Sequence, residues 1–402
     1  MKKKLNLKNF KHYILKHKLL FLLLFIIFLS AEYTLFIYKT NVEETMLVKG
    51  VSNIASSQVT QKYEAFRLES LVNLELKEMT TEEKIGQLFM TTITGNSIND
   101  DTRSLVEDYK VGNVILMSGN IVSQPLLSQL TSDLQDLSDT YMLIATDQEG
   151  GAVARIPWNS ARLISHKHIG VVNRKDFAYE AGENQALTLK EYDLNMNLAP
   201  VLDVNFMYNS SLVSRTFSSD PDTVALLGTE YIKGHQENGI IATAKHFPGI
   251  GRTSTDSHRS LPEIDISKEE LVSEELIPFQ AAVNNNVDTI MVGHVLYSQI
   301  DSEYPSSLSK IIVTDILRTE MGFEGVVITD DIRMGALNDY PEKVIDAINA
   351  GVDIILIVDT YENQVEYIKQ LQDAVEEGTV SEERINESVK RVLRLKLKYS
   401  VE

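Results

Sequence analysis

The 402-residue chain contains no cysteine. This absence excludes disulfide bonds, catalysis by a thiol, metal sites with thiolate ligands and membrane attachment through a lipid-modified cysteine. Tryptophan is nearly absent as well, because the chain has only one. That residue, Trp158, follows a proline, and we interpret it as a packing residue rather than a platform for a ligand. What remains is chemistry by carboxylate, imidazole, hydroxyl and amine groups.

Positive charge is scarce outside the first residues. The formal net charge is −19, although residues 1–18 contain seven lysines and no acidic residue, so the rest of the chain is more acidic still. Nucleic-acid binding depends on neutralising phosphates with basic side chains. An acidic body of this kind therefore excludes nucleic acid as a partner.

The N-terminal residues predict a membrane segment. Residues 19–29 are uninterrupted hydrocarbon, and apolar character continues to residue 38. About 20 such residues span a bilayer, and a preceding basic segment stays in the cytoplasm. We predict a cytoplasmic segment at 1–18, a transmembrane anchor at 19–38, and an extracellular body at the cell membrane. The alternative is a signal peptide cleaved near 29–31, which would leave the body secreted.

The stretch that follows predicts a stalk and then a barrel. Residues 39–78 are polar and mixed, with helical spacing of apolar residues at 63–76, and we interpret them as a stalk and lead-in helix. Thr80 and Glu83 have the spacing of a capping box that opens the next domain. Short apolar runs then alternate with helical patterns, which is typical of βαβ units. The eight predicted strands are 88–93, 114–117, 142–146, 196–204, 240–244, 289–292, 326–329 and 353–358.

Eight such units predict an α/β fold, a single (β/α)8 TIM-type barrel over residues 79–402. Helical patterns lie at 126–137, 222–237, 268–284, 309–321, 342–350, 362–377 and 381–397. An open doubly wound sheet is the alternative, but it is typically accompanied by a Gly-x-Gly-x-x-Gly turn after its first strand, and none occurs there. We expect the chain to be a monomer.

Charged and imidazole side chains follow five of the predicted strands, and in a barrel these positions gather at one face. Asp330 follows the seventh strand, and a loop after the fifth carries Asp256 and His258. A retaining glycoside hydrolase needs a carboxylate nucleophile and an acid/base, and a histidine held by a carboxylate is suited to the second role. Polar side chains that could hold a polyol are Asp147, Arg155, Arg215, Lys245 and His246.

Two other functions fit the same residues. His246, His294, Asp330 and either Asp256 or His258 could form the zinc site of a barrel hydrolase, although no His-Glu-x-x-His motif occurs. A barrel that binds sugar without catalysis is the third interpretation.

The motifs resemble those of family 3 glycoside hydrolases, in the β-N-acetylglucosaminidase (NagZ-type) branch. The resemblance rests on Lys-His-Phe-Pro-Gly at 245–249 with Asp-Ser-His at 256–258, and on Asp-Gln-Glu-Gly-Gly at 147–151. It also includes Glu-Lys-Ile-Gly-Gln-Leu at 83–88, Ala-Pro-Val-Leu-Asp-Val at 199–204 and Gly-Val-Val-Ile-Thr-Asp-Asp at 325–331. The similarity runs in order through residues 79–398. Ala152 and Ile250 depart from the family's usual residues, which bears on aglycone preference.

The resemblance implies a function and a set of roles. Asp330 would be the nucleophile, His258 the general acid and then base, and Asp256 its orienting partner. The residues implied to hold N-acetylglucosamine are Asp147, Arg155, Arg215, Lys245 and His246. The implied substrates are terminal β-linked N-acetylglucosaminides of peptidoglycan or muropeptide fragments, and no cofactor or metal is implied.

Overall fold

The computed structural model describes residues 49–158, 164–207 and 211–400, and the chain divides into two compact units, residues 1–67 and 68–402. In the first unit the described residues belong to helix α3 (Lys49–Glu78), which contains the helical segment predicted at 63–76. The predicted cytoplasmic segment (1–18) and anchor (19–38) lie outside the described residues. No helix in the described part of the chain is both long and apolar enough to cross a membrane.

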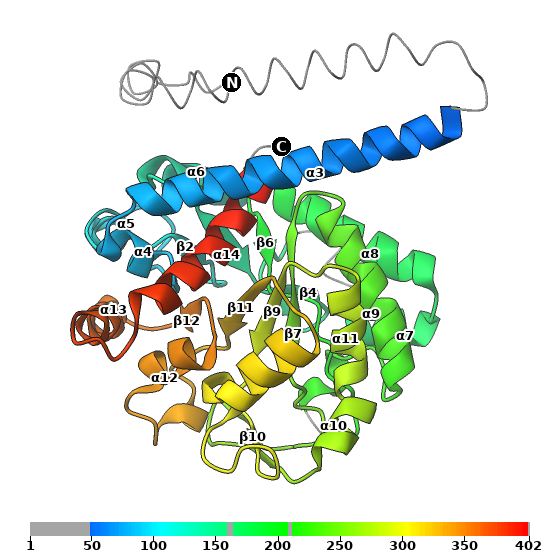
Figure 1. Ribbon diagram of the computed structural model, residues 1–402. Helices are drawn as coiled ribbons and strands as arrows, with labels where there is room; N and C mark the ends of the chain where they lie inside the picture. The colour runs from blue at the N-terminus through cyan, green and yellow to red at the C-terminus, as the bar shows by residue number, and fades with distance from the viewer. Residues whose placement is uncertain (1–48, 159–163, 208–210, 401–402) are drawn as a thin grey trace. The chain divides into compact units, whose positions relative to one another are not determined.

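The second unit is built on a closed sheet of eight parallel strands (Figure 1). The sheet order is β11-β9-β7-β6-β3-β2-β1-β12, and a parallel bridge between Ile328 and Ile354 joins its two ends. The prediction of a (β/α)8 barrel is confirmed, and an open sheet is excluded by this closure. The strands are β1 (Phe89–Thr92), β2 (Asn113–Ile115), β3 (Leu143–Thr146), β6 (Met196–Asn197), β7 (Ile241–Phe247), β9 (Thr289–Val292), β11 (Val326–Thr329) and β12 (Ile355–Ile357).

Burial on both faces explains why these strands read as continuous apolar runs. Every residue of β7, β9 and β11 is buried. A parallel strand covered by helices on one face and by the barrel interior on the other has no solvent face that would impose alternation. Each predicted strand is present, and β7 extends three residues beyond the predicted end, to Phe247.

Helices surround the strands, as Figure 1 shows. The capping box that opens the domain is confirmed, because Thr80 and Glu83 exchange backbone-to-side-chain hydrogen bonds of 2.8 and 3.2 Å. The helices after α3 are α4 (Thr81–Gly86), α5 (Asp100–Glu107), α6 (Gln124–Leu137), α7 (His166–Val172), α8 (Lys175–Lys190), α9 (Pro221–Gln236), α10 (Lys268–Ser273), α11 (Leu276–Asn284), the π-helix η4 (Ile311–Glu320), α12 (Lys343–Ala350), α13 (Tyr361–Glu376) and α14 (Glu382–Ser400).

Two helical predictions need correction. The single helix predicted at 268–284 is two helices, α10 and α11, because the chain leaves helical geometry at Glu274. Helices α5, α7 and α8 were not predicted. Helix α8 has weak amphipathic character because its buried face is made largely of small and polar residues, including Ala178, Ala181 and Gly182.

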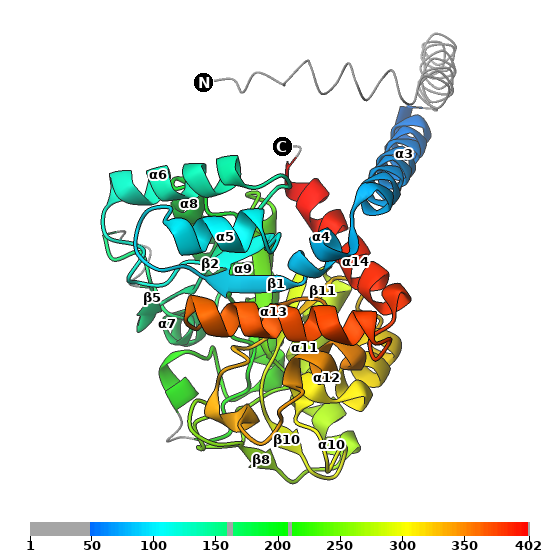
Figure 2. The same cartoon turned by 90° about the vertical axis from the view of Figure 1, so that its left-hand side faces the viewer.

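Short elements decorate the ends of the strands. An antiparallel hairpin of β4 (Gln148–Gly150) and β5 (Val153–Ala154) follows β3, and β8 (Glu263–Ile264) pairs in parallel with β10 (Leu296–Tyr297). The described residues also form the 3₁₀ turns η2 (Ser211–Ser214), η3 (Ser306–Leu308) and η5 (Gly335–Leu337). β8, β10 and α10 lie together at the lower edge of Figure 2. The segments after β3, β7, β9 and β11 therefore form one elaborated face of the barrel.

Candidate active site

Asp147, Arg155 and Lys245 form the first part of a polar cluster at this face. Asp147 follows β3, and its carboxylate accepts a 2.9 Å hydrogen bond from Lys245 Nζ at the end of β7. Its other oxygen accepts a 3.2 Å bond from Arg155 Nη2, which follows the β4–β5 hairpin. Among the described residues, the buried Nε of Arg155 has no hydrogen-bond partner.

Glu149 is the residue that sequence reasoning missed in this cluster. Its buried carboxylate receives a fork of two bonds from Arg215, of 2.7 and 2.9 Å, and lies 2.8 Å from Lys245 Nζ. Burial alone would raise the pKa of Glu149, but the charges of Lys245 and Arg215 outweigh it and hold that pKa well below its usual range. Burial would lower the pKa of Lys245, but Asp147 and Glu149 raise it. Glu149 and Lys245 are therefore both ionised at neutral pH.

His246 is fixed by Asp203. The ring Nδ1 of His246 lies 2.7 Å from the buried carboxylate of Asp203, whose other oxygen accepts a 2.8 Å bond from the Ile250 amide. Asp203 therefore braces the turn after β7. With Nδ1 occupied, Nε2 of His246 is the nitrogen that remains for a ligand. The Lys245–His246 peptide bond is cis, and the strand register shifts beside it.

Asp330 stands at the end of β11, half-buried, with a carboxylate that accepts a 2.8 Å bond from the Asp331 amide. Burial would raise the pKa of Asp330, but the fields of His246 and His294 together with the Asp331 amide lower it. The carboxylate is thus kept as the anion without a direct ion pair in the described structure. An ionised, unpaired carboxylate is what nucleophilic attack requires.

His294 and Asp331 support this strand end. His294 is buried, with Nδ1 2.7 Å from Ser307 Oγ and Nε2 3.0 Å from the Asp331 carbonyl oxygen, so both ring nitrogens are occupied. Asp331 accepts hydrogen bonds from the amides of Arg333 and Val358. Burial raises the pKa of Asp331 to about 6. Both residues fix the backbone around Asp330.

Asp256 and His258 form a pair on the exposed segment after β7. His258 Nδ1 lies 2.9 Å from the Asp256 carboxylate, which also accepts a 3.1 Å bond from the His258 amide. The hydrogen bond from His258 is the main cause that lowers the pKa of Asp256. Because Nδ1 faces the carboxylate, Nε2 is presented to the surroundings and can carry the transferable proton.

Hydrogen bonds bring this pair to the segment that carries Asp330. The amides of Gly335 and Ala336 donate to the carbonyl oxygens of His258 and Ser257, at 3.1 and 3.0 Å. The predicted residues therefore fall into three groups on one face: the Asp147–Arg155–Lys245–Arg215 cluster, the Asp330 strand end next to His246, and the Asp256–His258 pair. The described residues contain no group of three or more His, Asp or Glu side chains placed to hold a metal ion.

Two further residues have structural roles. Trp158 donates a 3.0 Å hydrogen bond to the Tyr192 hydroxyl and packs edge-on against its ring, which supports its interpretation as a packing residue. His166 is also buried, and no pattern in the sequence indicates it. It opens α7, lies 2.8 Å from the Arg215 carbonyl oxygen, and packs against Phe217 and Tyr231.

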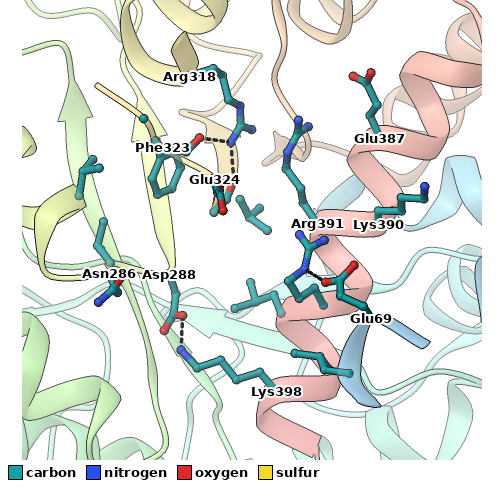
Figure 3. Close-up of a pocket in the computed structure, with 18 residues that line it drawn as sticks. Glu69, Asn286, Asp288, Arg318, Phe323, Glu324, Glu387, Lys390, Arg391 and Lys398 are labelled. Atoms are coloured by element: carbon teal, nitrogen blue, oxygen red, sulfur yellow. Dashed lines mark hydrogen bonds and ion pairs between the residues drawn. The ribbon is translucent and has the colours of Figure 1, made fainter. Parts of the chain in front are cut away.

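A cavity of about 890 Å³ lies at the other end of the barrel, where Asp288 precedes β9 and α14 passes (Figure 3). Several of its charged side chains are already paired, because Lys398 contacts Asp288 at 2.6 Å and Arg394 contacts Glu69. The amino-terminal face of such barrels serves stability, whereas sites lie at the opposite face. We therefore place the candidate site at the carboxyl ends of the strands.

Residues 80–395 match the N-terminal domain of glycosyl hydrolase family 3. A β-hexosaminidase of Tolumonas auensis is 33% identical over 292 residues, which is 71% of this chain and 86% of that protein. β-Hexosaminidase A of Pseudoalteromonas piscicida is 31% identical over 325 residues, which is 73% of this chain but 54% of that protein. A family 3 β-N-acetylglucosaminidase structure from Paenibacillus superposes with a TM-score of 0.79 at 36% identity, covering 80% of this chain and 63% of that one. This chain thus spans only part of two of these relatives.

Proposed function

The chain belongs to glycosyl hydrolase family 3, as its motifs predict, and we propose that it is a retaining β-N-acetylglucosaminidase. One observation carries the proposal: an ionised, half-buried carboxylate, Asp330, sits on a segment that is hydrogen-bonded to the segment bearing Asp256 and His258. A nucleophile on one strand end and an acid/base on the neighbouring loop are the two groups that retention needs. The β-hexosaminidase relatives support the choice of sugar.

In the first step, Asp330 attacks the anomeric carbon as the bond to the leaving group breaks. His258 donates its Nε2 proton to the departing oxygen, so that an alcohol leaves and a covalent glycosyl-enzyme remains. Asp256 fixes the ring through Nδ1 and stabilises its protonated form. In the second step, His258 removes a proton from water, the water oxygen bonds to the anomeric carbon, and the bond to Asp330 breaks.

The sugar in the reacting subsite is held by Asp147, Arg155, Arg215, Lys245 and His246. The guanidinium of Arg155 is a donor to sugar oxygens, and the Nε2 of His246 is the ring nitrogen left to contact the sugar. Asp147 accepts from a hydroxyl, while Glu149 keeps Lys245 and Arg215 in place.

A direct test uses an aryl N-acetyl-β-glucosaminide with Asp330→Ala and His258→Ala. Each substitution is expected to lower the rate by several orders of magnitude, because the nucleophile and the acid/base each lie on the reaction path. Asp339→Ala and His168→Ala, at exposed positions, are the matched controls. Near-full activity of Asp330→Ala would end the assignment.

The two alternatives make different predictions. A metal-dependent hydrolase would lose activity in a chelator, whereas the proposed mechanism keeps it. A sugar-binding barrel without catalysis would bind N-acetylglucosamine saturably and turn over no β-glycoside. Both measurements can be made on the same preparation.

The natural substrate and location are also part of the proposal. We infer that the substrates are peptidoglycan or muropeptide fragments, and that the apolar residues 19–38 keep the enzyme at the outer side of the cell membrane. Product analysis on purified muropeptides, wild type against Asp330→Ala, tests the first statement. Recovery of the full-length chain in the membrane fraction tests the second, and release of the body into the medium would contradict it.

A further inference from the structure

The segment after Asp330 forms a rigid platform. Asp331 is tied by its carboxylate to the amides of Arg333 and Val358. The short turn η5 then begins, and it is anchored by Leu337, which is fully buried, and by Ala336, which is nearly so. The platform therefore moves with the strand that carries Asp330 and not with the loop that faces it.

The loop that carries His258 has little packing of its own. The His258 side chain is 74% exposed, and Ser254, Thr255 and Arg259 are exposed as well. Its start is held by a 2.7 Å hydrogen bond from the Tyr297 hydroxyl to the Gly249 carbonyl oxygen, and its end by pairing of β8 with β10. The first part of the loop is also held by the Ile250 amide, which donates to Asp203, and by Arg252, which pairs with Glu274 and Glu275. Beyond Arg252, the part that carries His258 is joined to the described barrel by the two backbone hydrogen bonds from Gly335 and Ala336.

Gly335 allows that contact because it has no side chain. A Cβ at this position would lie 2.6 Å from the Arg259 carbonyl oxygen and 2.9 Å from that of His258. Real Cβ atoms do not approach backbone oxygen this closely, and neither partner is the end of a flexible side chain. Any larger residue at 335 must push the loop away from the platform.

We propose that Gly335 is a positioning residue for the acid/base step, holding His258 at a fixed place relative to Asp330 by letting the two segments touch backbone to backbone. The inference rests on the proposed function. Displacement of a reacting group by about 1 Å can cost on the order of a hundredfold in rate. A substitution at Gly335 is therefore expected to impair proton transfer by His258 and to leave attack by Asp330 intact.

The experiment compares two substrates, phenyl and 2,4-dinitrophenyl N-acetyl-β-glucosaminide, with Gly335→Ala and Gly335→Val. The dinitrophenolate leaves without a proton, so its release needs Asp330 but not His258, whereas phenolate release needs both. Gly119→Ala is the matched control, because a Cβ at this loop glycine after β2 would meet no atom within 4 Å. Rates are scaled by the initial burst of dinitrophenolate, which counts the molecules whose Asp330 site is intact.

Gly335→Ala is expected to lower kcat/KM for the phenyl substrate by on the order of tenfold to a hundredfold, and Gly335→Val by more. kcat/KM for the dinitrophenyl substrate is expected to stay near the wild-type value. Azide should speed steady-state turnover of the variants. Its nitrogen attacks the anomeric carbon as the bond to Asp330 breaks, giving a β-glycosyl azide, and no base is required.

Equal losses on both substrates, wild-type kcat/KM on both, or no acceleration by azide would each overturn the inference. A failure of the proposed function looks different. In that case wild type would give no burst, or Asp330→Ala would stay active, and the inference would fall with it. A wild-type burst with Gly335 variants that behave as wild type overturns the inference alone.

Discussion

Glu149 shows what sequence reasoning overlooks at the scale of single residues. The motif at 147–151 drew attention to Asp147, yet the more buried carboxylate is the one two residues later. The sequence contained a hint of this role, because Lys245 and Arg215 were predicted to lie in one site. Two cations in one site need carboxylates nearby to neutralise their charge. Only the fold shows that both point at Glu149, since the contacts span many tens of residues in sequence.

Glu149→Gln is expected to weaken both sugar binding and the fold. The amide leaves two buried cations with one anion fewer, and breaking a buried pair in this way costs roughly 3–5 kcal/mol of unfolding free energy. KM should rise and kcat/KM fall by on the order of tenfold to a hundredfold as Lys245 and Arg215 shift. Steady-state kinetics and denaturant unfolding check both effects.

The control for this substitution is Glu107→Gln, which removes one partner of an exposed pair with Arg103. Surface pairs contribute only about 0–1 kcal/mol. If Glu149→Gln is as mild as its control in both KM and stability, the electrostatic account of the cluster is wrong.

Asp256→Asn tests the orienting role in the acid/base pair. The lowered pKa of Asp256 means that it is ionised at neutral pH and stabilises a protonated His258 ring. An amide cannot do this, so kcat on the phenyl substrate is expected to fall by about 10²–10⁴. The exposed Asp265, which accepts a hydrogen bond from Gln299, provides the control substitution Asp265→Asn. A kcat within twofold of wild type would show that His258 works without its partner.

At the scale of elements, strands were easier to predict than helices. The barrel strands lie in mostly apolar runs bounded by turn residues, because burial on both faces favours apolar side chains. The fourth run, predicted as one strand over 196–204, forms only the two-residue strand β6 (Met196–Asn197). Helices with an apolar stripe, such as α6 and α14, were also predicted. Helix α8 was missed because its interface needs small residues: a Cβ on Gly182 would lie 2.3 Å from the Tyr231 carbonyl oxygen. Such close helix contacts leave no periodic apolar signal.

Candidate residues on strand ends were predictable for the same reason, since a strand end marks the site face. The exceptions depend on the long loops. No sequence pattern states that Gly335 touches the loop at 256–259, because that glycine has an ordinary backbone conformation and is required only for space. Asp203 could be expected to brace a turn, but its partner His246 is known only from the fold.

Asp353→Asn tests how η4 and α14 are fixed to the start of β12. The buried Asp353 carboxylate is contacted by Arg318 of η4 and accepts a 3.0 Å bond from Arg391 of α14. Removing the charge should cost roughly 3–5 kcal/mol of unfolding free energy, measured by denaturant titration. Asp373→Asn, on the exposed side of α13, is the control.

The loss of stability caused by Asp353→Asn should depend on pH. Burial would raise the pKa of Asp353, but Arg318, Arg391 and Arg384 lower it. A carboxylate with a lowered folded pKa stabilises the protein above the unfolded pKa of about 4, and this contribution is lost as the pH falls through the folded value. The stability difference between wild type and Asp353→Asn should therefore shrink in acid. A difference that stays constant would contradict the charge-based explanation.

At the scale of the whole molecule, the two ends of the barrel use charge differently. At the carboxyl ends of the strands, Asp330 has no ion-pair partner and the Nε2 of His246 has no hydrogen-bond partner among the described residues, and so both are available to a substrate. At the amino ends, several cations of α14 are paired with acids from distant parts of the chain, such as Lys398 with Asp288 and Arg394 with Glu69. Reactivity at one end is thus separated from the contacts that close the fold at the other.

Lys396 is the buried charge that links the C-terminal helix to the start of the barrel. Its ammonium donates to Gln87 Oε1 at 2.5 Å and to the Gly112 carbonyl oxygen at 2.8 Å, which joins α14 to the entrances of β1 and β2. Burial lowers its pKa to about 7, although Glu75 acts in the opposite direction. Below that pH the folded protein must hold a desolvated cation that the unfolded chain keeps in water.

Lys396→Met is therefore expected to change how global stability depends on pH. Between about pH 7 and pH 10 the unfolded chain binds a proton at Lys396 that the folded protein does not, so wild-type stability should rise with pH by at most about 1.4 kcal/mol per unit from this group. The Lys396→Met variant should lack this slope. The two oxygens that lose the ammonium each keep another donor: the Thr140 hydroxyl for Gln87 Oε1 and the Leu143 amide for the Gly112 carbonyl. Denaturant unfolding from pH 6 to 9.5 measures the slope of stability against pH for both proteins. The control is Lys175→Met, because Lys175 is exposed at the start of α8. Parallel stability curves for wild type and Lys396→Met would show that the buried lysine stays charged in the folded state.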